Sequence, residues 1–126
     1  MASRQRIFEI QDYSGTRVVL GAKEWNNKII SDAPIGHPEV ADYVDTIRLT
    51  IGEPDIVFES TTRSDTRLLY KLNAGRDEYQ GKHLVIVVKY VQETDALRGY
   101  VSTAYLARGL YAGGKILWQR KNLLAN

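Results

Sequence analysis

The spacing of apolar residues changes between Ile51 and Ile56, and this change limits the possible folds more than any other feature of the sequence. Before it, apolar residues at i, i+3, i+4, i+7 and i+11 form one stripe and predict an amphipathic helix from Pro38 to about Ile51. These residues are Val40, Tyr43, Val44, Ile47 and Ile51. Gly52 and Pro54 end that helix. Beyond them, the pattern predicts strands.

Four strands are predicted in this second part of the chain. They cover residues 56–60, 67–72, 83–91 and 99–105, and polar or glycine-containing segments separate them. The run HLVIVVKYV at 83–91 has an unbroken apolar core, which indicates a central strand that is buried on both faces. Residues 115–118 form a further candidate strand.

The first part of the chain predicts a hairpin and another helix. Residues 7–11 and 17–20 flank the turn sequence DYSG and indicate a β-hairpin. A helix follows around Trp25, and Pro34 lies in the segment that ends it. Helices and strands that are segregated along a chain are typical of the α+β class. We therefore expect a hairpin, two helices and a four-stranded antiparallel meander.

The composition is that of one globular domain spanning residues 1–126. The chain is 44% hydrophobic and 25% charged, and it has no cysteine, which excludes disulfides and thiol chemistry. No apolar run approaches the roughly 20 residues that a membrane helix needs, and the first residues contain no apolar signal segment. We therefore expect a cytoplasmic protein without membrane contact.

The net charge of +2 hides an asymmetry between the two halves of the chain. Residues 1–62 hold 6 basic and 10 acidic side chains, a net charge of −4, whereas residues 63–126 hold 11 and 5, a net charge of +6. A basic half is able to form a phosphate-binding face. Folding could equally mix the two signs over the surface.

Several kinds of site are excluded by the residues present. Two distant histidines and no cysteine make no recognisable zinc site. The chain has no Walker loop, no dinucleotide-binding fingerprint and no GxSxG elbow. Glu39, Asp42 and Asp45 share one helix face, but solvated surface charge accounts for them. The sequence therefore predicts neither a metal nor a cofactor.

The remaining candidates are polar side chains on or beside the predicted strands, together with His37. Arginine and lysine bind phosphate, tyrosine stacks on bases or donates a hydrogen bond, and a threonine hydroxyl donates to phosphate oxygens. His37 either only starts the helix at Pro38 or transfers a proton, as histidine does near neutral pH. Together these are the parts of metal-independent RNA cleavage, in which a 2′-hydroxyl attacks the adjacent phosphate. The strand candidates are Arg67, Tyr70, Lys89, Tyr90, Thr103 and Tyr105.

The order of several short motifs resembles a known family. An Asp-x-x-Gly turn and a Trp-bearing helix precede His37-Pro38-Glu39 and Pro54-Asp55. An Arg-x-x-Tyr strand, Lys89-Tyr90, Thr103-Ala104-Tyr105 and a Gly-Gly-x-x-Leu-Trp segment follow. Over about residues 8–118, this order resembles the phage and mobile-element branch (PBECR) of the barnase, EndoU, colicin and RelE-like ribonuclease superfamily.

This resemblance implies an N-terminal hairpin and two helices packed on a curved four-stranded antiparallel sheet whose open side is the active face. It implies metal-independent cleavage of RNA by a toxin-type or phage-type protein. Candidate targets are tRNA and ribosome-associated mRNA, and a candidate partner is a cognate immunity or antitoxin protein. The implied catalytic residues are His37, Arg67, Lys89, Thr103 and Tyr105. We expect Tyr70, Tyr90 and Lys115 to bind the substrate.

The chain departs from the family pattern in its first helix. Relatives often carry a second histidine there, where this chain has Asn26-Asn27-Lys28. This departure keeps open a non-catalytic nucleic-acid-binding or protein-interaction module on the same fold. A third alternative is a structural protein whose acidic first half and basic second half support self-association or an acidic partner.

Overall fold

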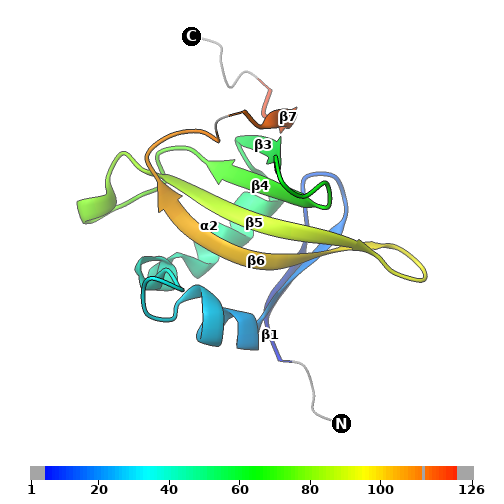
Figure 1. The fold of residues 1–126 in the computed structure, drawn as a ribbon, viewed down its shortest axis with the longest axis horizontal. Coiled ribbons are helices and arrows are strands. Elements are labelled where there is room, and N and C mark those ends of the chain that lie inside the picture. The colour runs from blue at the N-terminus through cyan, green and yellow to red at the C-terminus, as the bar shows by residue number, and fades with distance from the viewer. Residues whose placement is uncertain (1–4, 112, 122–126) are drawn as a thin grey trace.

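A computed structural model of the chain describes residues 5–111 and 113–121. The fold is α+β, as the sequence predicts, and its helical and extended segments are distributed along the chain as expected (Figure 1). The strands are β1 (Arg6–Gln11), β2 (Arg17–Gly21), β3 (Ile56–Glu59), β4 (Thr66–Lys71), β5 (His83–Gln92), β6 (Leu97–Ala107) and β7 (Lys115–Gln119). The helical segments are α1 (Ala22–Glu24), the π-helical η1 (Trp25–Ile29), the 3-10 segments η2 (Pro38–Tyr43) and η3 (Asp77–Tyr79), and α2 (Val44–Gly52).

The prediction of a four-stranded antiparallel sheet is wrong, because the strands form one seven-stranded mixed sheet in the order β1-β2-β6-β5-β4-β3-β7. The N-terminal hairpin joins the meander through a parallel pairing of β2 with β6, in which Val18 lies opposite Gly99. A Cβ atom on Gly99 would lie only 2.8 Å from Cγ2 of Val18. The close approach of these two strands therefore requires glycine. At the other edge, β7 pairs with β3.

The predicted helix from Pro38 to Ile51 is present, with its first turns as η2 and the rest as α2. Four of the five residues of the predicted stripe are buried, and the fifth, Val44, is half-buried. The segment packs on one face of the sheet, behind it in the view of Figure 1. None of the helices within residues 5–111 and 113–121 is long and apolar enough to cross a membrane.

The turn of the N-terminal hairpin is closed by Asp12, which is buried. Its Oδ1 accepts hydrogen bonds from the main-chain N–H groups of Ser14 (2.8 Å) and Thr16 (2.9 Å). An aspartate that binds the backbone two and four residues later fixes a turn in this way. The hairpin, predicted from the DYSG sequence, is confirmed.

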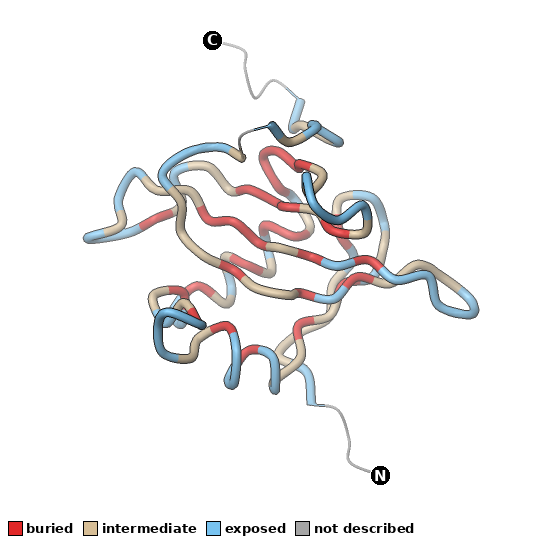
Figure 2. The backbone as a smooth tube through the Cα atoms, in the orientation of Figure 1, coloured by how far each residue is buried: buried red, intermediate tan, exposed pale blue. Residues whose placement is uncertain are grey.

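A second apolar cluster lies on the face of the sheet opposite α2, and we call this face the open face. Its buried members come from β3, β4 and β5 and are Ile56, Phe58, Leu68, Tyr70 and Val85. Figure 2 shows that burial is greatest along the central strands and α2 and that the loops at both ends of the sheet are exposed. The central strand β5 therefore carries buried residues on both faces, as its unbroken apolar core predicts.

Candidate functional site

The two faces of the sheet separate residues that the sequence motifs bring together. Side chains alternate between faces along a strand, so residues one or three apart point in opposite directions. On β4, Tyr70 belongs to the cluster on the open face, whereas Arg67 points to the α2 side. On β5, Lys89 and Tyr90 are divided in the same way.

Arg67 and Tyr90 lie within a polar network under the N-terminal hairpin. The guanidinium of Arg67 stacks on the ring of Tyr90, and its Nη1 donates to the hydroxyl of Tyr13 at 2.9 Å. The Tyr90 hydroxyl donates to Oδ2 of Asp12 at 2.5 Å. Burial, followed by this hydrogen bond to Asp12, raises the pKa of Tyr90. The network joins the hairpin to β4 and β5.

The open face contains a depression of about 510 Å³, which we call the basic depression. Three cationic side chains and five side-chain hydroxyls line it, Leu68 and Val87 are its apolar members, and no carboxylate is among its lining residues. The residues that line it are Lys28, Ser60, Thr62, Arg63, Thr66, Leu68, Val87, Lys89, Ser102 and Tyr111. Such a surface is suited to an anion whose oxygens accept several hydrogen bonds.

The three cations of the basic depression come from three separate elements. Lys28 extends from η1, and its Nζ donates to Oγ of Ser102 on β6 at 3.3 Å. Lys89 lies on β5 opposite Thr66, and Arg63 lies in the loop between β3 and β4. In that loop, Oγ of Ser60 accepts from the main-chain N–H of Arg63 at 3.2 Å. Within the described part of the chain, none of the three cations forms an ion pair with a carboxylate.

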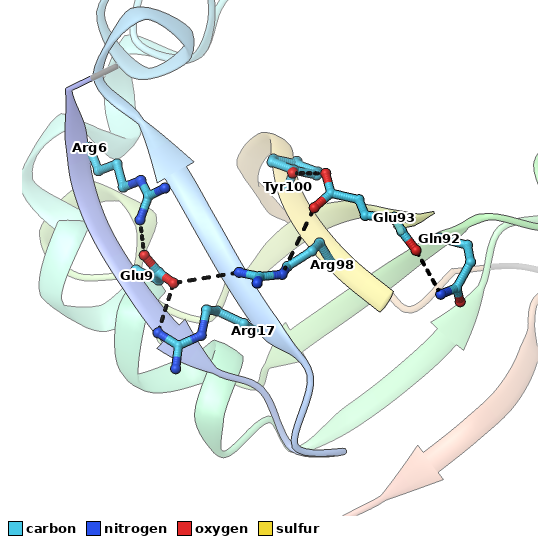
Figure 3. A network of polar contacts seen from close by, with 7 residues as sticks. All are labelled: Arg6, Glu9, Arg17, Gln92, Glu93, Arg98 and Tyr100. Atoms are coloured by element: carbon cyan, nitrogen blue, oxygen red, sulfur yellow. Dashed lines mark hydrogen bonds and ion pairs between the residues drawn. The ribbon is translucent and has the colours of Figure 1, made fainter. Parts of the chain in front are cut away.

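A second group of basic residues, on β1, β2 and β6, is paired with carboxylates instead (Figure 3). Glu9 forms ion pairs with Arg6, Arg17 (2.7 Å) and Arg98 (4.0 Å), and Arg98 also lies 3.9 Å from Glu93. The hydrogen bond from Arg17, opposed in part by desolvation, lowers the pKa of Glu9. A ligand at the basic depression therefore meets cations without carboxylates among the lining residues, whereas a ligand at this network meets cations that are paired with carboxylates.

Tyr111 stands at the border between the basic depression and the apolar cluster of the open face. Its ring lies 6.2 Å from that of Phe58, centroid to centroid, and its hydroxyl accepts from the main-chain N–H of Thr61 at 3.0 Å. The Oγ1 of Thr61 lies 2.8 Å from the same oxygen. Hydrogen bonds from the side chain and main chain of Thr61, and from the side chain of Ser60, lower the pKa of Tyr111.

His37 packs against Tyr105 and does not line the basic depression. The two ring centroids are 5.4 Å apart, and Nδ1 of His37 lies 3.4 Å from Oε2 of Glu39. His37 occupies the N-cap position of η2, but its side chain makes no capping hydrogen bond. Its main-chain N–H donates to the carbonyl oxygen of Ile29 at 2.6 Å. Tyr105 pairs with Val85, four residues along β5 from Lys89, which is about 13 Å at the spacing of a strand.

Three further predicted residues lie around this region. Thr103 pairs with Val87, which lines the basic depression, so Thr103 is placed between the depression and Tyr105. Tyr70 is only 2% exposed and therefore offers little surface to a base. Lys115 lies on β7 opposite Glu59 and does not line the basic depression.

Sequence reasoning missed most of the basic depression. Thr66 follows the same alternation as Leu68 and Tyr70, so the period of β4 could have placed it on the open face. Lys28 and Arg63 reach the site from a helix and a loop, and no local sequence pattern indicates that they meet. Lys28 lies in the segment where relatives in the resembled family often carry a histidine, and in this structure it brings a cation to β6.

The described residues contain no group of three or more histidine, aspartate or glutamate side chains placed to hold a metal ion. Comparisons with models of protein families, with curated proteins and with solved structures match nothing to this chain. The family resemblance therefore depends on the order of the sequence motifs, and the site depends on its own geometry.

Proposed function

We propose that this protein is a metal-independent ribonuclease that binds the RNA backbone in the basic depression. One observation carries the proposal: three cations and five hydroxyls line one surface that has no carboxylate among its lining residues. A phosphate diester carries one negative charge and has oxygens that accept hydrogen bonds, which matches this set of donors. An acidic peptide matches this surface less well. Phosphate oxygens project in several directions and can accept from many hydroxyls, which suits the five hydroxyls of the basic depression.

In this proposal, Lys28, Arg63 and Lys89 hold the phosphate and stabilise the charge that develops on it. Arg63 is able to bind two oxygens at once, and the lysines act as point charges. The attacking group is the RNA's own 2′-hydroxyl, so the protein supplies positioning, charge and proton transfer. Thr103 and Tyr105 extend the site along β6 toward His37 and contact the next nucleotide. Arg67 and Tyr90 have no part in it, because they lie on the other face.

A second candidate is a non-catalytic RNA-binding module on the same surface. The observation that favours it is the absence of histidine and carboxylate from the lining of the basic depression. These side chains are the usual groups that accept a proton in RNA cleavage. Both candidates predict RNA binding, and only the first predicts a cut.

The test is cleavage of labelled tRNA and of ribosome-associated mRNA by the pure protein in EDTA. The variant Lys89→Ala removes a cation from the basic depression, and Arg17→Ala is the matched control that removes a cation from the ion-pair network of Figure 3. The ribonuclease proposal expects wild type and Arg17→Ala to cut RNA alike and Lys89→Ala to cut at least tenfold more slowly. Binding of RNA without a cut by any of them supports the binding module.

A further inference from the structure

We propose that Tyr111 is the catalytic residue that accepts the proton of the attacking 2′-hydroxyl. This inference rests on the proposed ribonuclease function and assigns a group to the step that the sequence motifs left to His37. Its basis is geometric: Tyr111 lines the same depression as Lys28, Arg63 and Lys89, whereas His37 does not.

Thr61 offers the Tyr111 oxygen two hydrogen bonds that would stabilise its phenolate form. The main-chain N–H of Thr61 is able only to donate, and it lies 3.0 Å from the tyrosine oxygen. Thr61 Oγ1 is 2.8 Å from the same atom and can donate as well. An oxygen that receives two donors is stabilised in its ionised form, because hydrogen bonds to the charged form favour it.

The surrounding chain fixes the position of the ring. A Cβ atom on Gly114 would lie 2.4 Å from Cδ2 of Tyr111, so this glycine allows the ring to lie where it does. The ring of Phe58 is a second neighbour, with the two ring centroids 6.2 Å apart. The phenol oxygen is therefore held beside the loop that also carries Arg63.

The pKa of Tyr111 is shifted in the opposite direction from those of Tyr70 and Tyr105. Burial and the nearby tyrosines raise the pKa of Tyr105 and raise that of Tyr70 to about 12, whereas the hydrogen bonds from Thr61 and Ser60 lower that of Tyr111. The charged side chains that line the basic depression with Tyr111 are its three cations. Cations near a phenolate favour it, so no group lining the depression opposes ionisation of Tyr111.

The chemical step balances with the groups present. The Tyr111 phenolate takes the proton of the 2′-hydroxyl while the 2′-oxygen forms a bond to phosphorus. The bond from phosphorus to the 5′-oxygen breaks, and the ammonium group of Lys28 or Lys89 gives a proton to that oxygen. The products are a 2′,3′-cyclic phosphate and a 5′-hydroxyl. Tyr111 then loses its proton to water, and the lysine regains one.

The pH profile of cleavage distinguishes Tyr111 from His37. Because a tyrosine base is mostly protonated at neutral pH, the rate should rise about tenfold per pH unit from about pH 6.5 to 8.5. A histidine base of ordinary pKa would make the rate level off near about pH 6.5. We expect wild type and His37→Ala to share the rising profile.

The variants are Tyr111→Phe and, as a matched control outside the depression, Tyr79→Phe. Tyr111→Phe should cut RNA about 10²-fold to 10⁴-fold more slowly, with RNA affinity within about threefold of wild type. Tyr79→Phe should match wild type. Thr61→Val removes the hydroxyl that would donate to the Tyr111 phenolate and should move the rising part of the profile to higher pH.

A readout that needs no RNA accompanies these rates. Subtracting the ultraviolet titration of Tyr111→Phe from that of wild type isolates the ionisation of Tyr111. The midpoint of this ionisation should lie below pH 10, and it should lie at a higher pH in Thr61→Val. Cleavage by Tyr111→Phe within threefold of wild type with an unchanged pH profile would overturn the assignment and leave the ribonuclease proposal standing. A wild-type protein that binds RNA and cuts none would overturn both.

Discussion

The guanidinium carbon of Arg67 lies 4.3 Å from the centre of the Tyr90 ring, on the face of the sheet that packs against α2. This stacking and the hydrogen bond to Tyr13 give Arg67 a structural role, so we expect Arg67→Ala to lower the free energy of unfolding by about 1–3 kcal/mol. RNA affinity should stay within about twofold of wild type once the variant is folded. Urea unfolding and RNA titration measure the two effects.

Arg63→Ala is the matched control for this prediction. It removes the same type of side chain from the loop that borders the basic depression, so it should weaken RNA binding and change stability by less than about 0.5 kcal/mol. Loss of RNA binding by folded Arg67→Ala, with full binding by Arg63→Ala, would reverse the assignment of the two faces.

RNA binding should depend strongly on salt, because phosphate contacts release counterions. We expect Lys28→Ala and Lys89→Ala each to reduce the slope of log K against log salt by about 0.7, the value for one contact to a single strand. Arg17→Ala should leave the slope unchanged, since Arg17 is paired with Glu9 and lies outside the basic depression. Equal slopes in all three variants would place the RNA elsewhere on the surface.

Asp55 should hold the edge strand β7 in place. Its buried carboxylate accepts from the N–H of Leu72 through Oδ2 at 2.8 Å, and Nε of Arg120 lies 2.8 Å from Oδ1. Asp55→Ala leaves the Leu72 N–H without its acceptor and the Arg120 guanidinium without its ion-pair partner, and it should cost about 2–3 kcal/mol of unfolding free energy.

Hydrogen exchange locates this effect along the chain. Arg120→Ala should speed the exchange of amides in β7 more than of those in β5, because only the contact at the edge is lost. The exposed Arg108 supplies a control substitution that should leave β7 protected. Uniform loss of protection in Arg120→Ala would show that β7 opens only with the whole domain.

Stability should fall in alkaline solution. Burial raises the pKa of Tyr70 to about 12 in the folded protein, against about 10 in an unfolded chain. Above pH 10 the unfolded chain has lost a proton that the folded protein keeps, so the contribution of Tyr70 is present below pH 10 and is lost between pH 10 and 12. Over this range, the free energy of unfolding should fall by about 1.4 kcal/mol per pH unit because of Tyr70. Urea unfolding of Tyr70→Phe over this pH range should show a shallower fall than wild type does.

Local patterns in the sequence predicted the elements well. The stripe from Val40 to Ile51 and the turn at Asp12 depend on neighbours in sequence, and both are present in the structure. The pairing of β2 with β6 and of β3 with β7 was not predicted. Hydrophobic periodicity and turn-forming residues locate strands, but they do not show which distant strands pair.

The site was predicted only in part for two physical reasons. Arg67 and Tyr70 are three residues apart, and side chains three apart on a strand point to opposite faces. The sequence motif nevertheless led us to expect both in one site. Lys28, Arg63 and Tyr111 come from a helix and two loops, so only the folded chain shows that they line one depression with Lys89. Whether His37 takes part in catalysis stays a prediction that the pH profile decides.

The parallel pairing of Val18 with Gly99 joins an early part of the chain to a late one. During synthesis, β1 and β2 emerge first as an isolated hairpin, and an isolated hairpin is marginally stable in water. Its partner strand β6 follows only after both helices and three other strands have been made. Closing so long a segment costs entropy before the contact forms, which slows folding. We therefore expect the N-terminal hairpin to stay without its partner strand β6 during most of translation. The sheet is completed only when nearly the whole domain has left the ribosome.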